Sequence, residues 1–235
     1  MAIYSSPASL HNLALHITDK NIWIRYKAIR TLHYLVSTSR GADSIIKAGF
    51  IPFLIKRLLV EEREMIGVIL NILRTLLQRD VKRLAIQLGI LPTLIHFVFD
   101  EFYDISSFAQ DCLELVLTES NVKATIDSEC LTFLKTRRYE TDRETSLKSV
   151  QVYNILSAST FLRKKIAEPE IIDQILNVSW KFKTDNQIVL LCFKTLFNLC
   201  EVPIARRILE RRKYFIINVF LPLEKRFRNL SMLCE

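Results

Sequence analysis

The chain has 235 residues, half of them apolar, which is enough to bury a sizeable core in one long domain or an extended array. Its 4 glycines and 6 prolines are too few for a turn-rich β sandwich and favour helices. The formal net charge is +8, and residues 121–235 carry nearly all of the excess, which favours an acidic partner. No apolar run is as long as a membrane span and no signal-peptide pattern opens the chain, so we expect a soluble cytoplasmic protein.

Helices are predicted from the N-terminal residues onward. Residues 8–17 form a short helix that acts either as an N-terminal cap or as the remnant of an upstream repeat. From Asn21 the helices follow in groups of three, a long one, a short one and a third beyond a corner. At the first corner Gly49 suits the left-handed residue that ends one helix, and Pro52 suits the first turn of the next. The same phrase returns 40 residues later with Gly89 and Pro92. The helices predicted after residue 20 are 23–37, 43–48, 52–59, 65–77, 81–88, 92–99, 108–117, 122–126, 131–134, 147–157, 161–180 (with a corner at 168–170), 187–200 and 204–223. Residues 137–145 are predicted to form a longer loop.

Apolar residues recur at a spacing of 40 residues, which is typical of a stacked-repeat protein. Four columns show it: Ile46, Ile86, Ile126 and Ile166; Ile51, Leu91, Leu131 and Ile171; Leu32, Ile72, Cys112 and Val152; Val36, Leu76, Val116 and Leu156. We therefore divide the chain into a partial repeat at 1–20 and five repeats at 21–62, 63–103, 104–145, 146–185 and 186–235. The predicted fold is a single all-α array that spans residues 1–235.

The phrase Ile46-x-x-Gly49-x-Ile51-Pro52-x-Leu54, in a unit of three helices, resembles the armadillo repeat. The HEAT repeat is the near alternative, but it has two helices and lacks this glycine corner. The resemblance covers nearly the whole chain and implies a right-handed superhelical solenoid of about five armadillo repeats.

A narrower resemblance involves Ile24-Arg25, Arg40-Gly41-Ala42 and Val60-Glu61, and continues through residues 69–80. These residues are similar to a segment of the radial spoke head 14 homolog family, armadillo-repeat proteins in the radial spokes of motile cilia. The resemblance implies a non-catalytic scaffold subunit of a ciliary axonemal assembly. The alternative is a cytosolic armadillo adaptor that binds extended peptide segments of partner proteins.

No motif for catalysis, cofactors or metals emerges. The four histidines lack the spacing of zinc ligands, and His33 and His96 are expected to be partly exposed histidines on helices. No glycine-rich phosphate loop or nucleophile elbow is present. The neighbouring carboxylates Glu61 and Glu62 are expected at a solvated turn. Five cysteines without a C-x-x-C pair indicate free thiols rather than a disulfide framework. We expect no enzyme activity, no cofactor, no metal and no small-molecule substrate.

Two asparagines are candidate partner-binding residues. Peptide-binding armadillo proteins use an asparagine in a Leu-x-Asn-Leu pattern, and the matching residues are Asn198 and, more loosely, Asn154. An amide suits this role because it offers a donor and an acceptor to a peptide main chain. The earlier repeats lack the asparagine, which argues against an import receptor that grips one long peptide. In the alternative interpretation both asparagines only bridge or cap neighbouring helices.

Basic residues are the second set of candidates, and they fall at matching places in the last two repeats. Stacking would gather them into one stripe that docks on an acidic surface, such as a coiled coil or a tubulin tail; the alternative is an ordinary solvated face. Aromatic residues are not interleaved with them, which disfavours nucleic acid. The candidates are Arg163, Lys164, Lys165, Arg206, Arg207, Arg211 and Arg212. The apolar run at 215–223 needs a polar cap or a neighbour, and we expect this end to contact a partner.

Overall fold

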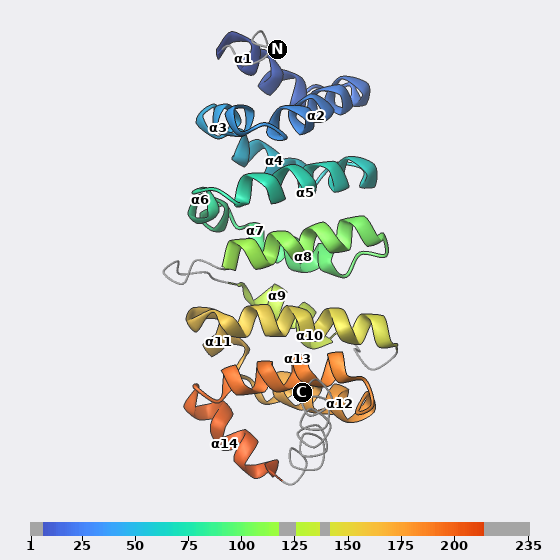
Figure 1. The fold of residues 1–235 in the computed structure, drawn as a ribbon, viewed down its shortest axis with the longest axis vertical. Helices are drawn as coiled ribbons and strands as arrows, with labels where there is room; N and C mark the ends of the chain where they lie inside the picture. The colour runs from blue at the N-terminus through green and yellow to red at the C-terminus, as the bar shows by residue number, and fades with distance from the viewer. Residues whose placement is uncertain (1–6, 118–125, 137–141, 214–235) are drawn as a thin grey trace, which may run out of the picture. The chain divides into compact units, whose positions relative to one another are not determined.

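A computed structural model describes residues 7–117, 126–136 and 142–213. Within these ranges every regular element is a helix, from α1 (Pro7–Ile17) to α14 (Pro203–Arg211), and no strand occurs (Figure 1). The all-α prediction is therefore confirmed. The chain divides into two compact units, Met1–Val122 and Lys123–Glu235, with the boundary inside the third predicted repeat.

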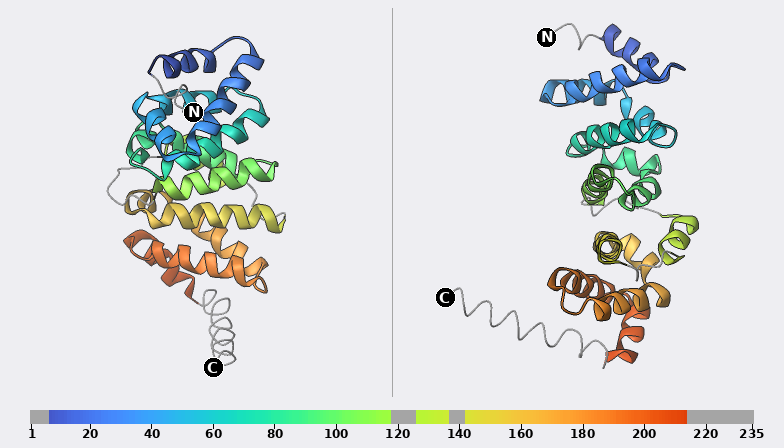
Figure 2. Two further views of the ribbon diagram at one scale, coloured as in Figure 1. Left: turned by 45° about the horizontal axis from the view of Figure 1, so that its top comes forward. Right: turned by 90° about the vertical axis from the view of Figure 1, so that its right-hand side faces the viewer.

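The first unit follows the predicted three-helix order. Its long helices α2, α5 and α8 pack against one another in succession, and α4 and α7 pack against the long helix that follows each of them (Figures 1 and 2). The bounds are α2 (Ile22–Val36), α3 (Ser39–Lys47), α4 (Phe50–Leu58), α5 (Arg63–Leu77), α6 (Lys82–Gln87), α7 (Ile90–Val98) and α8 (Tyr103–Leu117).

The second unit repeats this order. Its long helices α10 and α13 pack together, α12 packs against α13, and α14 packs against α12. The bounds are α9 (Ser128–Thr136), α10 (Arg143–Ala158), α11 (Thr160–Ile166), α12 (Pro169–Lys181) and α13 (Asn186–Leu199). The loop predicted at 137–145 is wrong at its end, because Asp142 caps α10 by accepting a 2.8 Å hydrogen bond from the Thr145 amide. The predicted helix at 122–126 and the run at 215–223 lie outside the described residues, apart from Ile126, which is not helical.

Two of the four apolar columns lie wholly in the core, whereas Ile46, Ile86 and Leu131 of the other two are half-buried. Leu32, Ile72, Cys112 and Val152 have no exposed surface, and the column from Val36 to Leu156 is buried throughout. The corner glycines also behave as predicted: Gly49 has φ 74° and Gly89 has φ 75°, in the left-handed region that side chains avoid. Helix α4 begins at Phe50, so Pro52 lies in its first turn.

Glu61 differs from the prediction of a solvated carboxylate. Its side chain is completely buried, and Arg25 donates to both of its oxygens, at 2.8 Å from Nε to Oε1 and 3.2 Å from Nη2 to Oε2. Arg57 donates to Oε1 as well, at 2.6 Å from Nε. The physical reason is that two guanidinium groups replace the water that the carboxylate loses on burial. Glu62 is exposed, as expected.

Candidate functional site

A row of polar side chains crosses the three long helices of the first unit. Arg74 on α5 donates to Asn71 Oδ1 at 2.9 Å and to Asp111 Oδ2 on α8 at 3.0 Å. The Asn71 amide nitrogen lies 3.0 Å from His33 Nε2 on α2. Because Asn71 uses its oxygen to accept from Arg74, its amide group donates to His33, whose Nε2 is the acceptor. We call His33, Asn71, Arg74 and Asp111 the polar row.

The row is accessible and well supported. All four side chains are half-buried, so each retains a surface that a partner can touch. The Arg74 guanidinium also lies over the Phe108 ring, 4.8 Å from its centroid, which fixes its plane. The apolar columns of α2, α5 and α8 hold the three helices beneath it. The polar row therefore presents imidazole, amide, guanidinium and carboxylate groups on three successive long helices.

Sequence reasoning did not single out this row. His33 was expected as a partly exposed helix histidine, which is confirmed, but Asn71, Arg74 and Asp111 were not considered. A signal was present in the sequence: polar residues recur on successive long helices 38 residues apart at His33 and Asn71, and 37 apart at Arg74 and Asp111.

A second polar feature lies on α2 itself. Arg30 donates to the Tyr26 hydroxyl at 3.0 Å and to the Tyr34 hydroxyl at 3.2 Å. The hydrogen bond with Tyr34, followed by that with Tyr26, raises the pKa of Arg30. Arg30 is exposed and its charge is held between two rings, which keeps one face of α2 polar.

The predicted asparagines are both half-buried in the second unit, on different helices. Asn198 on α13 donates from Nδ2 to Ser157 Oγ on α10 at 3.0 Å, so it bridges neighbouring long helices. The main-chain carbonyl of Asn154 accepts from the same Ser157 hydroxyl at 2.8 Å. The helix caps Asp142 and Asp185 are 43 residues apart, whereas the asparagines are 44 apart, so the two asparagines do not occupy equivalent positions.

The basic candidates divide into one buried residue and several exposed ones. Arg163 is only 7% exposed; it donates to the main-chain oxygens of Ser157 and Ala158 at 2.7 and 3.2 Å and pairs with Glu201. Its guanidinium therefore holds the end of α10 and does not face a partner. Arg206 donates in the same way to the main-chain oxygen of Cys200 at 3.1 Å, so Arg163 and Arg206 make equivalent contacts with the ends of α10 and α13.

The other basic candidates lie on the surface. Arg212 is exposed and lies 3.2 Å from Asp173 of α12, so part of its charge is already matched. The remaining exposed candidates are Lys164, Lys165, Arg206, Arg207 and Arg211. Their assembly into one docking stripe stays a prediction.

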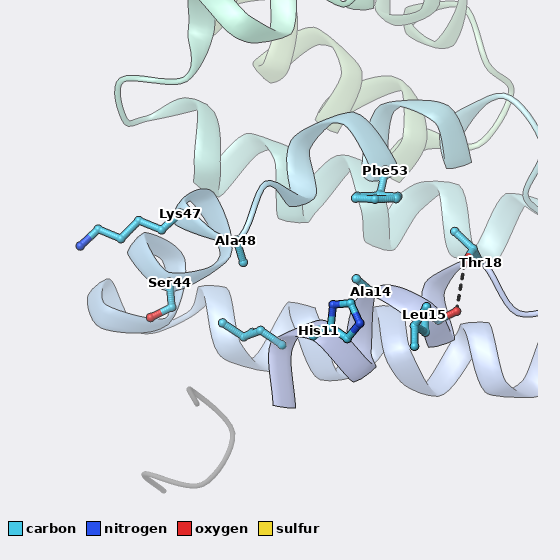
Figure 3. Close-up of a pocket in the computed structure, with 9 residues that line it drawn as sticks. His11, Ala14, Leu15, Thr18, Ser44, Lys47, Ala48 and Phe53 are labelled. Carbon is cyan, nitrogen blue, oxygen red and sulfur yellow. Dashed lines mark hydrogen bonds between the residues drawn. The ribbon is translucent and has the colours of Figure 1, made fainter. Parts of the chain in front are cut away.

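A hollow of about 670 Å³ lies between α1 and the corner of α3 and α4 (Figure 3). Leu10, Ala14 and Leu15 line it from α1, and Ala48 and Phe53 line it from the other side. The lining is mainly apolar, and its titratable residues are His11 and Lys47.

The described part of the chain offers no metal site, since no group of three His, Cys, Asp or Glu residues in it is arranged to hold an ion. Its four cysteines are free thiols, and Cys234 lies outside the described residues. Burial raises the pKa of Cys130 to about 12 and raises those of Cys112 and Cys192 as well. These thiols are protonated and unreactive at neutral pH. None of the described helices is long and apolar enough to span a membrane.

No model of a known protein family matches the sequence, and no curated protein matches it significantly. Solved structures do match the fold. An engineered protein is 18% identical with a TM-score of 0.60 over 83% of this chain and 80% of its own. A designed armadillo repeat protein is 14% identical with a TM-score of 0.59 over 82% of each chain.

A third similar structure comes from work on the interaction between cadherin and β-catenin. It is 18% identical with a TM-score of 0.58, over 82% of this chain and 37% of its own. A designed armadillo repeat protein in complex with the peptide (KR)4 is 12% identical with a TM-score of 0.51, over 80% of this chain and 98% of its own. This chain therefore has the all-α fold of armadillo-repeat solenoids.

Proposed function

We propose that the protein is a non-catalytic scaffold that binds segments of other proteins on the exposed face of its long helices. The observation that carries this proposal is the polar row, which joins α2, α5 and α8 through His33, Asn71, Arg74 and Asp111. An extended chain presents donors and acceptors at regular intervals, and groups repeated on successive helices can pair with them. The structurally similar complex with (KR)4 supports the same use of this fold.

The finer proposal places this scaffold in the cytoplasm of ciliated cells, in a ciliary axonemal assembly and specifically the radial spoke. It is supported by the resemblance of residues 24–80 to the radial spoke head 14 homolog family. Its partners would then be other subunits of the assembly. Two of the residues that carry the resemblance, Arg25 and Glu61, are held together in the buried ion pair.

The alternative function is a cytosolic adaptor for extended peptides, independent of cilia, that uses Asn154 and Asn198. The accessible part of Asn198 beside its bond to Ser157 favours a role in the second unit similar to that of the polar row.

Fractionation of motile cilia distinguishes the axonemal subunit from the cytosolic adaptor. An axonemal subunit stays with the salt-washed axoneme and cross-links to its neighbours there, whereas an adaptor appears in the cytosolic fraction. A chain that stays in neither complex nor axoneme, and that binds no protein segment in vitro, would contradict both.

A further inference from the structure

The side chains of the polar row occupy two matching positions on the long helices of the first unit. Counted from the start of each helix, Asn71 and Asp111 are each the ninth residue of their helix. His33 and Arg74 are each the twelfth residue. Both hydrogen bonds between helices therefore join a twelfth residue to the ninth residue of the next long helix. This repeated register identifies the residue that stands at each end of the row.

At the α2 end of the row the ninth residue is Arg30, which is exposed. Its guanidinium donates to the hydroxyls of Tyr26 and Tyr34, one turn to either side, at 3.0 and 3.2 Å. Because each hydroxyl accepts from Arg30, its own hydrogen remains to be donated to a further group. Among the described residues no carboxylate pairs with Arg30. The cluster thus holds hydrogen-bond donors around one positive charge, which suits a carboxylate from a partner.

At the α8 end of the row the twelfth residue is Glu114, which is also exposed. Gln110, one turn before it, donates from Nε2 to Glu114 Oε1 at 3.2 Å. Gln110 is uncharged, so this bond orients the carboxylate and leaves its charge in place. In the part of the chain that the structure describes, no cation pairs with Glu114. This end of the row therefore carries an oriented negative charge.

Between the two ends the charges of the row cancel. Arg74 pairs with Asp111 at 3.0 Å, and Asn71 is an uncharged amide. The composition of the helices follows the same gradient, because α2 contains no Asp or Glu and α8 contains no Lys, Arg or His. The exposed face of these three helices is therefore positive at α2, balanced at α5 and negative at α8.

We propose that the polar row selects protein segments that place an acidic residue on Arg30 and a basic residue on Glu114. The inference rests on the proposed function and states which segments the scaffold binds. Packed helices lie about 8–10 Å apart, so the two steps from α2 to α8 span about 16–20 Å. An extended chain rises about 3.3 Å per residue and its side chains alternate between two faces, so residues i and i+6 cover this span on one side. The partner is thus an extended segment with two opposite charges about six residues apart.

The test selects peptides on the full chain from a random display library and compares their charges with those of the unselected library. We expect enrichment of one acidic and one basic residue at the spacing i, i+6. A selected peptide is then made in two forms, one unchanged and one with its acidic residue replaced by Lys. At low ionic strength Arg30→Glu should bind the unchanged form at least about fivefold more weakly than the wild type does, because attraction becomes repulsion. The same variant should bind the Lys form more tightly than the wild type does.

Matched controls separate this charge preference from a general effect of charge. Lys56→Glu reverses an exposed cation on α4, outside the row, and should change the affinity by less than about twofold because distant surface charges are screened. For the other end, Glu114→Lys is tested against Asp80→Lys, whose site is exposed in the turn after α5. Selected peptides without the charge pattern, or equal losses for Arg30→Glu and Lys56→Glu, would overturn the inference and leave the proposed function intact. Failure to select any peptide would overturn both.

Discussion

Arg25 and Glu61, 36 residues apart, form an ion pair between the start of α2 and the turn that precedes α5. The carboxylate has no exposed surface, and Arg57 completes its surroundings by donating from Nε at 2.6 Å. The buried carboxylate and its two guanidinium partners depend on one another, because the loss of any one of them leaves an uncompensated charge.

Removal of this carboxylate should strongly reduce the stability of the fold. Glu61→Ala leaves two arginines facing a buried space, and we expect the free energy of unfolding to fall by about 3 kcal/mol. The adjacent Glu62→Ala is the control, since Glu62 is exposed and makes no capping hydrogen bond, and it should change stability by less than about 0.5 kcal/mol. Urea denaturation measures both. Equal losses would mean that the buried pair contributes nothing specific.

The two helical glycines of the first unit should respond in opposite directions. Gly41 is in the first turn of α3, where an added Cβ would overlap the Leu35 carbonyl and crowd Thr38 Oγ1, so Gly41→Ala should cost about 2 kcal/mol. Gly67 lies inside α5 with only Ile105 nearby, so Gly67→Ala should stabilise by up to about 1 kcal/mol through helix propensity. Thermal unfolding of the two variants gives the comparison, and a lower midpoint for Gly67→Ala would refute the packing described for α5 and α8.

Asp185 should make stability depend on acid pH. Burial alone raises the pKa of this carboxyl, but the Ile188 and Gln187 amides and the Arg143 guanidinium, 2.7 Å away, lower the pKa below its ordinary value of 3.8. A lowered folded-state pKa gives stability that is complete above the unfolded value and is lost as the pH falls through the folded value.

The comparison with Asp185→Asn isolates this charge, because asparagine retains the cap on α13 and loses the ion pair. The wild-type chain should be more stable at pH 6, and the difference should vanish as the pH falls well below 4. Denaturation at a series of pH values measures it. A difference that persists unchanged at pH 2 would show that the carboxylate charge is not its source.

The apolar columns made most of the fold predictable. A 40-residue step determined which faces of the long helices are buried, and the glycine at each of the first two corners indicated the left-handed residue found at Gly49 and Gly89. The polar contacts could not be predicted from this repeat pattern. Glu61, in the turn before α5, is buried because Arg25 reaches it from α2 and Arg57 reaches it from α4, and no local pattern contains both partners.

The candidate site was predicted less well, for a related reason. Repeat spacing changes from 40 residues to 43 between the caps of α10 and α13, so a similar motif in sequence, such as those around Asn154 and Asn198, falls at different places on the two helices. Arg163 belongs to an exposed-looking basic cluster, yet its planar guanidinium is used to satisfy carbonyl groups at the end of α10. The sequence shows the charges and the motifs, but it does not show how each helix is rotated about its axis and so which side chains face outward.

The most direct test of the protein-binding scaffold is to select peptides on the full chain from a random display library and to measure their affinity for matched variants. The double variant Asn71→Ala/Arg74→Ala removes the centre of the polar row, and Lys56→Ala/Lys181→Ala removes two exposed cations on α4 and α12, which are not candidate binding residues. The account predicts at least a tenfold loss of affinity, about 1.4 kcal/mol, for the first and less than about a twofold change for the second, with unchanged circular dichroism. Full affinity after loss of Asn71 and Arg74, or failure of the chain to bind any peptide, would contradict it.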